Sequence, residues 1–565
     1  MKELIIGQIP KDYKPNNHII LGPFCLSERR ETYKYLEKIN FIEDPFNSPE
    51  ELRAADELTA KFAKNFLMSN FNQFNSQYNV SYSYNYWSII YLPWVFALTQ
   101  LIWERQARIN SAIKKWGDIP LKVNLVKDNI PWLFIDTLDF QKSGTMNLLF
   151  NEWLFSRIIE KLKPDCWEVT IIDKSNFYQQ KEISHISANR IFNLDKIRRL
   201  ATCDGVYGLN LIENLLFSFI LAIRPISKRP ISQSTVKNLT LENLDSFELN
   251  YDFNKYFQQL MPLSIREIDF NYFETKTKHK KIYITSASII FNDKIKPLLA
   301  TASEKGSIII SSQHGGHPYG VSSTYQQANL IEYCQRAFIT WGWKQHNNYK
   351  GNFINLPQPY LSKIRNRHKK TNDNLIYVST LPRLYSHRLQ STPQPVRQIE
   401  YLRDKRRFLD TINKNIFLHL LYRYYPSRVG AVDDKYYIHN YFPKIQYCDG
   451  NLDNQMFNCK LLVLDHLGTT INKAVGANIP FVGFWNLNDS PVSEDVLPFF
   501  KQLIEVKILF NSAKDAATHI NSIWDDIDNW WNDKDVQNAK REWGEKFAKS
   551  SVSWRREWIK FLWKV

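Results

Sequence analysis

The chain alternates between short apolar runs and longer segments in which apolar side chains recur at helical spacing. The clearest short runs are residues 121–126, 308–310, 375–378 and 461–464. A continuous apolar run of this length is typical of a strand buried on both faces, which is the environment of a parallel sheet. The alternation of such runs with helical segments therefore predicts an α/β protein of the doubly wound kind.

Strong helical patterns lie towards both ends of the chain. Ser48-Pro49-Glu50-Glu51 offers an N-cap, a proline in the first turn and early acidic residues, so a helix is expected to begin there. A second helix is expected over residues 86–108, where tryptophan and aliphatic side chains fall on one side, as in a core helix. Residues 513–531 and 536–563 predict tryptophan-rich helices that pack across the first domain or lie on a membrane surface.

A length of 565 residues exceeds what one hydrophobic core supports, so two domains or more are expected. Residues 344–373 are rich in Asn, Lys and Pro and are predicted to be a linker. Residues 1–343 would then form an N-terminal Rossmann-like domain with extra helices, and residues 374–530 a second Rossmann-like domain. Residues 531–565 would form a helical tail, and the two domains would face a shared cleft.

The charge balance favours an anionic partner. The formal net charge of +16 suits nucleotide phosphates, an acidic glycan or the inner face of a membrane, although a solubilising basic surface explains it equally well. Nucleic acid is the least favoured partner, because no nucleic-acid-binding signature is present. The basic segment containing Arg224, Lys228, Arg229 and Lys237 is either a docking site for an acidic acceptor or lipid headgroups, or a solvated loop.

Cysteine usage and apolar content bear on location. The six cysteines are scattered without paired spacing, as expected for free thiols in a reducing compartment. The first apolar run is too short for a signal peptide, and the most apolar stretch, residues 89–102, fits a buried helix better than a membrane span. We therefore expect a cytoplasmic protein, with peripheral attachment to the inner face of the cytoplasmic membrane as an alternative.

The most informative loop is residues 311–320, which follows a buried apolar run and carries three glycines and two histidines. Such loops at the carboxyl ends of parallel strands are where open α/β sheets bind ligands. Gly315 and Gly316 allow the backbone to approach a ligand closely, and Tyr319 belongs to the same loop. His314 can exchange a proton near neutral pH, which makes it the first candidate catalytic residue. The alternative is a tight turn with two solvated histidines.

Three loops in the second half of the chain carry groups that suit a phosphate. They provide hydroxyls, arginines, a histidine beside an aspartate, and a Gly-Thr-Thr element at a predicted helix N-terminus. The candidate binding residues are Ser379, Arg383, Arg423, Asp465, His466, Gly468, Thr469 and Thr470. For the Gly-Thr-Thr element, the alternative is a simple capping turn.

Two further segments could contribute to the same site. Asp136 and Asp139 follow a predicted strand at residues 132–135 and are reserve candidates for a general base or a nucleophile, although acids are common in turns. Residues 322–335 predict a helix whose N-terminus would face the same space as His314 and attract an anion.

Two facing α/β domains with these loops have the layout of a twin-Rossmann nucleotide-sugar transferase, the glycosyltransferase B architecture. The chain has no Asp-x-Asp element of the metal-binding kind. Arginines and a helix dipole would then have to neutralise the leaving phosphate. We therefore expect no metal ion and no other cofactor, with the nucleotide sugar serving as a substrate.

The chain also resembles the transferases encoded in bacterial O-antigen and surface-polysaccharide gene clusters. The matching pieces are Leu21-Gly22-Pro23-Phe24-Cys25, Tyr86-Trp87, Pro93-Trp94, Glu104-Arg105, Ser312-Gln313-His314-Gly315-Gly316-His317-Pro318-Tyr319-Gly320, Thr340-Trp341-Gly342-Trp343, Asp465-His466 and Gly468-Thr469-Thr470. The resemblance implies transfer of a glycosyl group to a glycan or lipid-linked glycan. It also implies a Glu after the Thr-Thr element for the donor ribose, where this chain has Asn472.

The expected function is thus a metal-independent glycosyltransferase acting on a nucleotide-sugar donor and a surface-polysaccharide acceptor. Two alternatives stay open: a nucleotide-sugar epimerase with the same two-domain layout, and a non-catalytic protein that binds glycans or assists their assembly.

Overall fold

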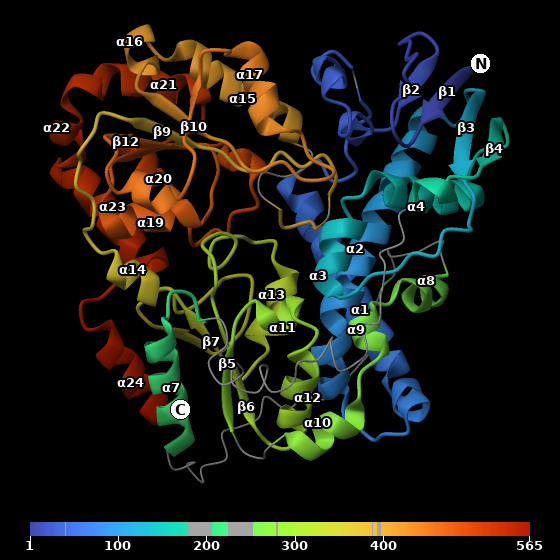
Figure 1. The fold of residues 1–565 in the computed structure, drawn as a ribbon, viewed down its shortest axis with the longest axis horizontal. Coiled ribbons are helices and arrows are strands. Elements are labelled where there is room, and N and C mark those ends of the chain that lie inside the picture. Colours follow the sequence, from blue (N-terminus) through green and yellow to red (C-terminus); the bar gives the residue numbers. More distant parts are fainter. Residues whose placement is uncertain are drawn as a thin grey trace.

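The computed structural model describes residues 1–39, 41–178, 206–223, 244, 252–277, 281–386, 388–391 and 397–565 (Figure 1). The basic segment around Arg224 and Lys237 lies outside these residues. The described residues form three sheets in which every strand pairing is parallel. Parallel sheets flanked by helices confirm the predicted α/β class.

The N-terminal sheet has the strand order β2-β1-β3-β4. Its strands are β1 (Lys2–Ile5), β2 (His18–Ile20), β3 (Leu121–Val126) and β4 (Trp167–Ile172). The long helices α1 (Pro49–Tyr78) and α2 (Tyr84–Trp116) separate β2 from β3, and α4 (Leu148–Leu162) packs on β3. Helix α1 begins as predicted, with Ser48 and Glu51 forming a reciprocal capping box.

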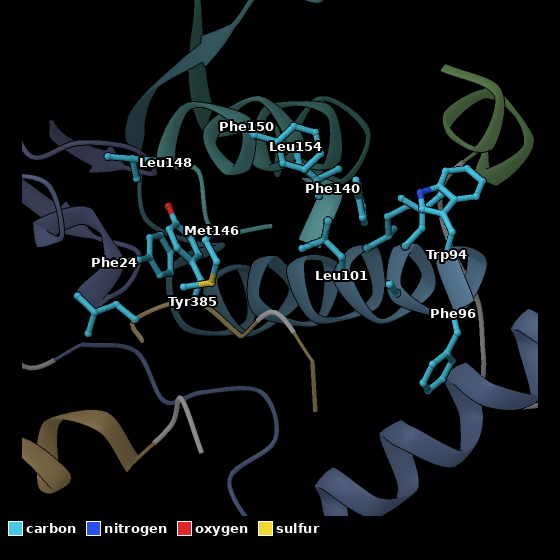
Figure 2. Packing of buried hydrophobic residues seen from close by; sticks show 14 of the residues in the cluster. Phe24, Trp94, Phe96, Leu101, Phe140, Met146, Leu148, Phe150, Leu154 and Tyr385 are labelled. Carbon is cyan, nitrogen blue, oxygen red and sulfur yellow. The ribbon is translucent and has the colours of Figure 1, made fainter. Parts of the chain in front are cut away.

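Helix α2 is the main core helix of this part of the molecule. Figure 2 shows Leu101 of α2 near Phe140, together with Phe150 and Leu154 of α4. Within the described part of the chain, α2 alone has the length and apolar composition of a membrane span, and 89% of an apolar 18-residue part of it is buried inside the protein. Its apolar side chains are therefore used for packing in this structure, as predicted for a core helix.

The middle sheet contains β5 (Ile282–Thr285), β6 (Ile308–Ser312), β7 (Ala337–Thr340) and β8 (Phe353–Asn355), paired in chain order. Helix α12 (Lys296–Glu304) and the π-helical turn η5 (Asn329–Tyr333) contact β6. On the opposite face of the sheet, side chains of β5 and β6 share a buried cluster with α7 (Leu211–Ile223) and α24 (Trp554–Lys564). The last helix of the chain therefore packs on the middle sheet.

The third sheet has six strands in the order β11-β10-β9-β12-β13-β14. They are β9 (Leu375–Val378), β10 (Leu420–Arg423), β11 (Gln446–Tyr447), β12 (Leu461–Leu464), β13 (Phe481–Phe484) and β14 (Leu509–Phe510). Helices α15 (Gln398–Thr411) and α21 (Ala513–Ile523) pack against one another, and α19 (Thr469–Ala477), α20 (Leu497–Glu505) and α23 (Lys534–Phe547) form another packed group. Loops from this half also enter the N-terminal core: the Tyr385 ring stacks on Phe24 with centroids 4.5 Å apart (Figure 2).

The number of sheets differs from the expectation. Residues 1–343 contain the whole N-terminal sheet and three strands of a separate middle sheet, where one sheet was expected. Residues 344–373 were expected to be a linker, but they contain β8, which pairs with β7, and the helix α14 (Pro359–Lys363). Strand β8 is only three residues long, and strands so short leave little pattern in a sequence.

Two local predictions were wrong. Residues 132–135 form no strand; Trp132 instead packs on Phe150 from a loop, with ring centroids 5.0 Å apart. Residues 322–335 contain only the short helix α13 (Gln326–Ala328) followed by η5, so no long helix begins at residue 322. In each case apolar side chains are buried by tertiary packing without the regular element that their pattern predicted.

Candidate functional site

The loop after β6 and the loop between β12 and α19 are in direct contact. The backbone N–H of Gly316 donates to Oγ1 of Thr469 at 3.0 Å. A Cβ atom at Gly316 would lie 3.0 Å from Nδ2 of Asn472 and 3.1 Å from the carbonyl oxygen of Gly468. A side chain at Gly316 would crowd these atoms, so glycine favours the close approach, and the two loops that were predicted separately meet between the middle and third sheets.

Gln313 fixes the histidine loop to the Trp-Gly-Trp segment. Its Oε1 accepts hydrogen bonds from the backbone N–H of Trp341 at 3.0 Å and from Nε1 of Trp343 at 2.9 Å. Its Nε2 donates to the carbonyl oxygen of Gly315 at 2.7 Å. Gly342 has a φ of +134°, and a Cβ there would lie 2.3 Å from the carbonyl oxygen of Glu545 in α23. The site is therefore supported by a rigid, buried hydrogen-bond network.

His314 lies beside the buried side chains of Tyr319 and Glu332. The Tyr319 hydroxyl is 2.9 Å from Nδ1 of His314 and donates to Oε2 of Glu332 at 2.6 Å. Oε1 of Glu332 is 3.7 Å from the same His314 nitrogen. Burial, followed by the nearby positive charge of Arg388, lowers the pKa of His314 to about 4. The imidazole is therefore neutral at pH 7 and can accept a proton.

Glu332 is fully buried in the π-helical turn η5. Burial raises the pKa of Glu332 to about 8, although the hydrogen bond from Tyr319 opposes the shift. Turns of this kind occur often at functional sites. The sequence pattern around residues 322–335 did not single out this glutamate, because its importance depends on burial beside His314.

The raised pKa of Glu332 predicts a change in stability with pH. A carboxyl group whose folded pKa is above its unfolded value near 4.5 stabilises the fold below pH 4.5, and this contribution is lost as the pH rises to 8. Glutamine cannot ionise. We therefore expect the unfolding free energy of Glu332→Gln to fall less between pH 5 and pH 8 than that of the wild type. Chemical denaturation of both proteins across this range measures it. Parallel pH curves for the two proteins would contradict the assignment.

Two more histidines complete the group. Burial, then the proximity of His466 and Arg388, lowers the pKa of His317 to about 3. Nδ1 of His466 lies 2.9 Å from Oδ1 of Asp465, whose other oxygen accepts from the hydroxyls of Tyr377 and Tyr401. His317 lies in the loop after β6 of the middle sheet, and His466 lies in the loop after β12 of the third sheet. Each of the two loops therefore carries an imidazole. Asp465 is held rigidly and orients His466.

Positive charge gathers next to these histidines. The pKa of Arg383 is lowered to about 10, first by burial and then by the positive charges of Arg388 and Arg428. The Nε atom of Arg388 is buried without a hydrogen-bond partner. Neighbouring guanidinium groups repel one another, and a bound anion stabilises them by offsetting this repulsion. The structure thus adds Arg388 and Arg428 to the predicted Arg383.

Three of the predicted binding residues have structural contacts instead. Ser379 donates to Oδ2 of Asp434 at 2.8 Å and accepts from Nζ of Lys405 at 2.6 Å, within a buried ion pair. Arg423 donates to the carbonyl oxygen of Cys448 at 2.8 Å. Their side chains are thereby engaged in holding the third sheet.

Asn472 likewise binds the protein itself. Its Nδ2 donates to the carbonyl oxygen of Phe547 at 3.1 Å, and its Oδ1 accepts from Nε1 of Trp543 at 3.3 Å. Both polar atoms of the amide therefore hold α23 against α19. By contrast, Thr469 and Thr470 are partly exposed in the first turn of α19.

Asp136 and Asp139 lie in a capping turn. Oδ1 of Asp136 accepts from the backbone N–H of Asp139 at 2.7 Å, and Asp139 accepts from the N–H of Ile135 at 2.9 Å. Between them, Thr137 binds the buried Asp293, which pairs with Lys296 at the start of α12. These acids hold the N-terminal part against the middle sheet, and the structure does not group them with His314.

His314 and His317, whose pKa values are lowered, lie near Arg388 in a loop at the carboxyl end of a parallel strand, which is where α/β enzymes commonly bind their ligands. Among the described residues, no three His, Cys, Asp or Glu side chains come together as metal ligands would. Residues 2–562 match the family model described as the LIC12162 family transferase. The chain belongs to this family, and the protein is a transferase. No curated protein matches the chain.

Proposed function

We propose that this transferase moves a sugar from a nucleotide-sugar donor to a surface-polysaccharide acceptor of the O-antigen or capsule kind, as a cytoplasmic glycosyltransferase with a glycosyltransferase B-like arrangement. The observation that carries the proposal is the contact between Gly316 and Thr469, which joins the histidine loop to the loop that starts α19. This contact supports the proposal because it brings the loop of His314 next to the start of α19, and transfer from a phosphorylated donor requires a proton acceptor near an anion-binding region.

The donor phosphates would bind at Arg383 and Arg388, with the N-terminus of α19 supplying N–H groups and the hydroxyls of Thr469 and Thr470. A helix N-terminus favours negative charge. Gly468 at the N-cap has no side chain to satisfy these N–H groups. Together these groups replace a metal ion in neutralising the leaving nucleotide.

His314 would act as the general base. When Glu332 is ionised, it accepts from the Tyr319 hydroxyl, which in turn accepts from the N–H at Nδ1 of His314. Nε2 then keeps its lone pair and takes the proton of the acceptor hydroxyl. The acceptor oxygen bonds to the anomeric carbon of the sugar, and the bond from that carbon to the nucleotide phosphate breaks with its electrons on the phosphate.

A thermal-shift panel with UDP, GDP, CMP and dTDP tests the proposal. A nucleotide present at 100 times its dissociation constant stabilises the folded protein by about 2.7 kcal/mol. We expect one of the four to raise the melting temperature, with EDTA leaving the shift unchanged. Absence of any shift would argue against a nucleotide-dependent enzyme and favour a non-catalytic assembly protein. Conversion of the matching nucleotide sugar into an isomer without an acceptor would indicate an epimerase.

A further inference from the structure

Helix α7 is apolar on two opposite faces. Phe217, Ile220 and Leu221 are buried against the middle sheet and α24. The opposite face exposes large apolar side chains, with exposed fractions from 42% to 76%: Leu211, Ile212, Leu215, Leu216, Phe219 and Ile223. Monomeric soluble proteins rarely leave so many large apolar side chains together in water, and such a face usually marks an interaction surface.

Helix α24 lies beside α7 in the same outer layer (Figure 1). The Phe217 ring stacks on Trp558 with centroids 5.6 Å apart, and both helices pack into one cluster with β5 and β6. Because both cover the same face of the middle sheet, their outward faces point to the same side of the molecule. The outward face of α24 is basic and carries one exposed tryptophan: Arg556, Lys560, Trp563 and Lys564. Arg555 points towards α7 instead, where it donates to Oε1 of Glu213 at 2.7 Å.

We propose that the outward faces of α7 and α24 form a surface that binds an anionic lipid bilayer. The apolar side chains of α7 would enter the boundary between headgroups and acyl chains, with Trp563 at headgroup level. The three outward basic residues of α24, Arg556, Lys560 and Lys564, would lie against the negative headgroups. The single acidic side chain on α24, Glu557, is only partly exposed and bonds to Ser551 and Ser553, so it opposes this attraction weakly.

The combination of residues favours a membrane over a protein partner. Lysine is depleted in protein–protein interfaces, whereas an apolar face next to basic residues and a tryptophan is typical of helices at membrane surfaces. The proposal rests on α7 and α24 alone, and does not depend on the sugar-transfer proposal. It does, however, fit an acceptor that is linked to lipid.

Co-sedimentation of the full chain with vesicles tests this surface. We expect binding to vesicles of phosphatidylcholine mixed with phosphatidylglycerol, and much weaker binding to phosphatidylcholine alone. The double variant Leu215→Glu/Phe219→Glu and the double variant Arg556→Glu/Lys560→Glu should each lower the partition coefficient about tenfold or more. Leu418→Glu is the matched control, because Leu418 is 73% exposed at a distant site next to β10, and it should bind as the wild type does.

Two results would overturn the proposal. One is wild-type protein that stays in the supernatant with both kinds of vesicle. The other is a folded Leu215→Glu/Phe219→Glu variant that binds as strongly as wild type. The competing occupant is a second copy of the chain, which light scattering after size exclusion would detect. If wild type is a dimer that binds no vesicles, and the Leu215→Glu/Phe219→Glu variant is a monomer, the surface is a dimer interface.

Discussion

Replacing His314 with alanine is expected to lower kcat for sugar transfer about 10²–10⁴-fold, the usual contribution of a general base. The imidazole is neutral throughout the physiological range because its pKa is lowered to about 4, so one ring nitrogen keeps its lone pair. The side chain is 24% exposed and its hydrogen-bond contact is with Tyr319, so its removal should cost the fold only about 1 kcal/mol. Steady-state kinetics and a thermal melt measure the two effects separately.

His439→Ala is the matched control, because His439 is exposed on the helix of residues 434–441. It should keep both the wild-type kcat and the wild-type melting temperature. A His314→Ala protein that unfolds would show that the histidine is structural, and one that keeps full activity would remove it from the mechanism. Glu332→Gln should alter the pH dependence of kcat near pH 8, since the pKa of Glu332 is raised to about 8 and the histidine is held through Tyr319.

Replacing Arg388 with glutamine is expected to weaken binding of the matching nucleotide about 10- to 100-fold. Arg388 lies close enough to His314 and Arg383 to lower the pKa of both, and its buried Nε has no hydrogen-bond partner. A hydrogen bond to a charged group contributes about 1.5–3 kcal/mol, which corresponds to this loss. Isothermal titration calorimetry measures the dissociation constant directly.

Two further variants sharpen this experiment. Arg388→Lys keeps the charge but loses the planar fork that binds two phosphate oxygens, so its dissociation constant should lie between those of wild type and Arg388→Gln. Arg365→Gln removes the same charge from an exposed position and should leave binding unchanged. If Arg388→Gln also binds like wild type, the phosphates do not bind at this arginine group.

Much of the secondary structure could be read from local patterns. The apolar runs at residues 121–126, 375–378 and 461–464 coincide with β3, β9 and β12, and the run at residues 308–310 begins β6. Strands buried on both faces leave a continuous apolar run, which is why these were recognised. Strand β1 was missed because only Leu4 and Ile5 of its four residues are apolar, although it is an inner strand of its sheet.

The site could be predicted only in part. The histidine loop and the Gly-Thr-Thr element were found from composition and position, and the structure brings them together. Ser379, Arg423 and Asn472 were assigned to a ligand because their residue types suit one, yet each is engaged by the protein. Glu332 and Arg388 were missed, because neither stands in a recognisable motif.

The sequence by itself determined the α/β class, most of the buried strands, the start of α1 and the two loops that carry histidines, glycines and threonines. These features depend on neighbours within one turn or one strand. Only the tertiary structure decided that there are three sheets among the described residues, and that Gly316 binds Thr469, 153 residues away. The tertiary structure also decided which polar side chains are available to bind a ligand. Burial and long-range pairing set the pKa and the hydrogen-bond partners of a side chain, and neither burial nor pairing leaves a pattern in the local sequence.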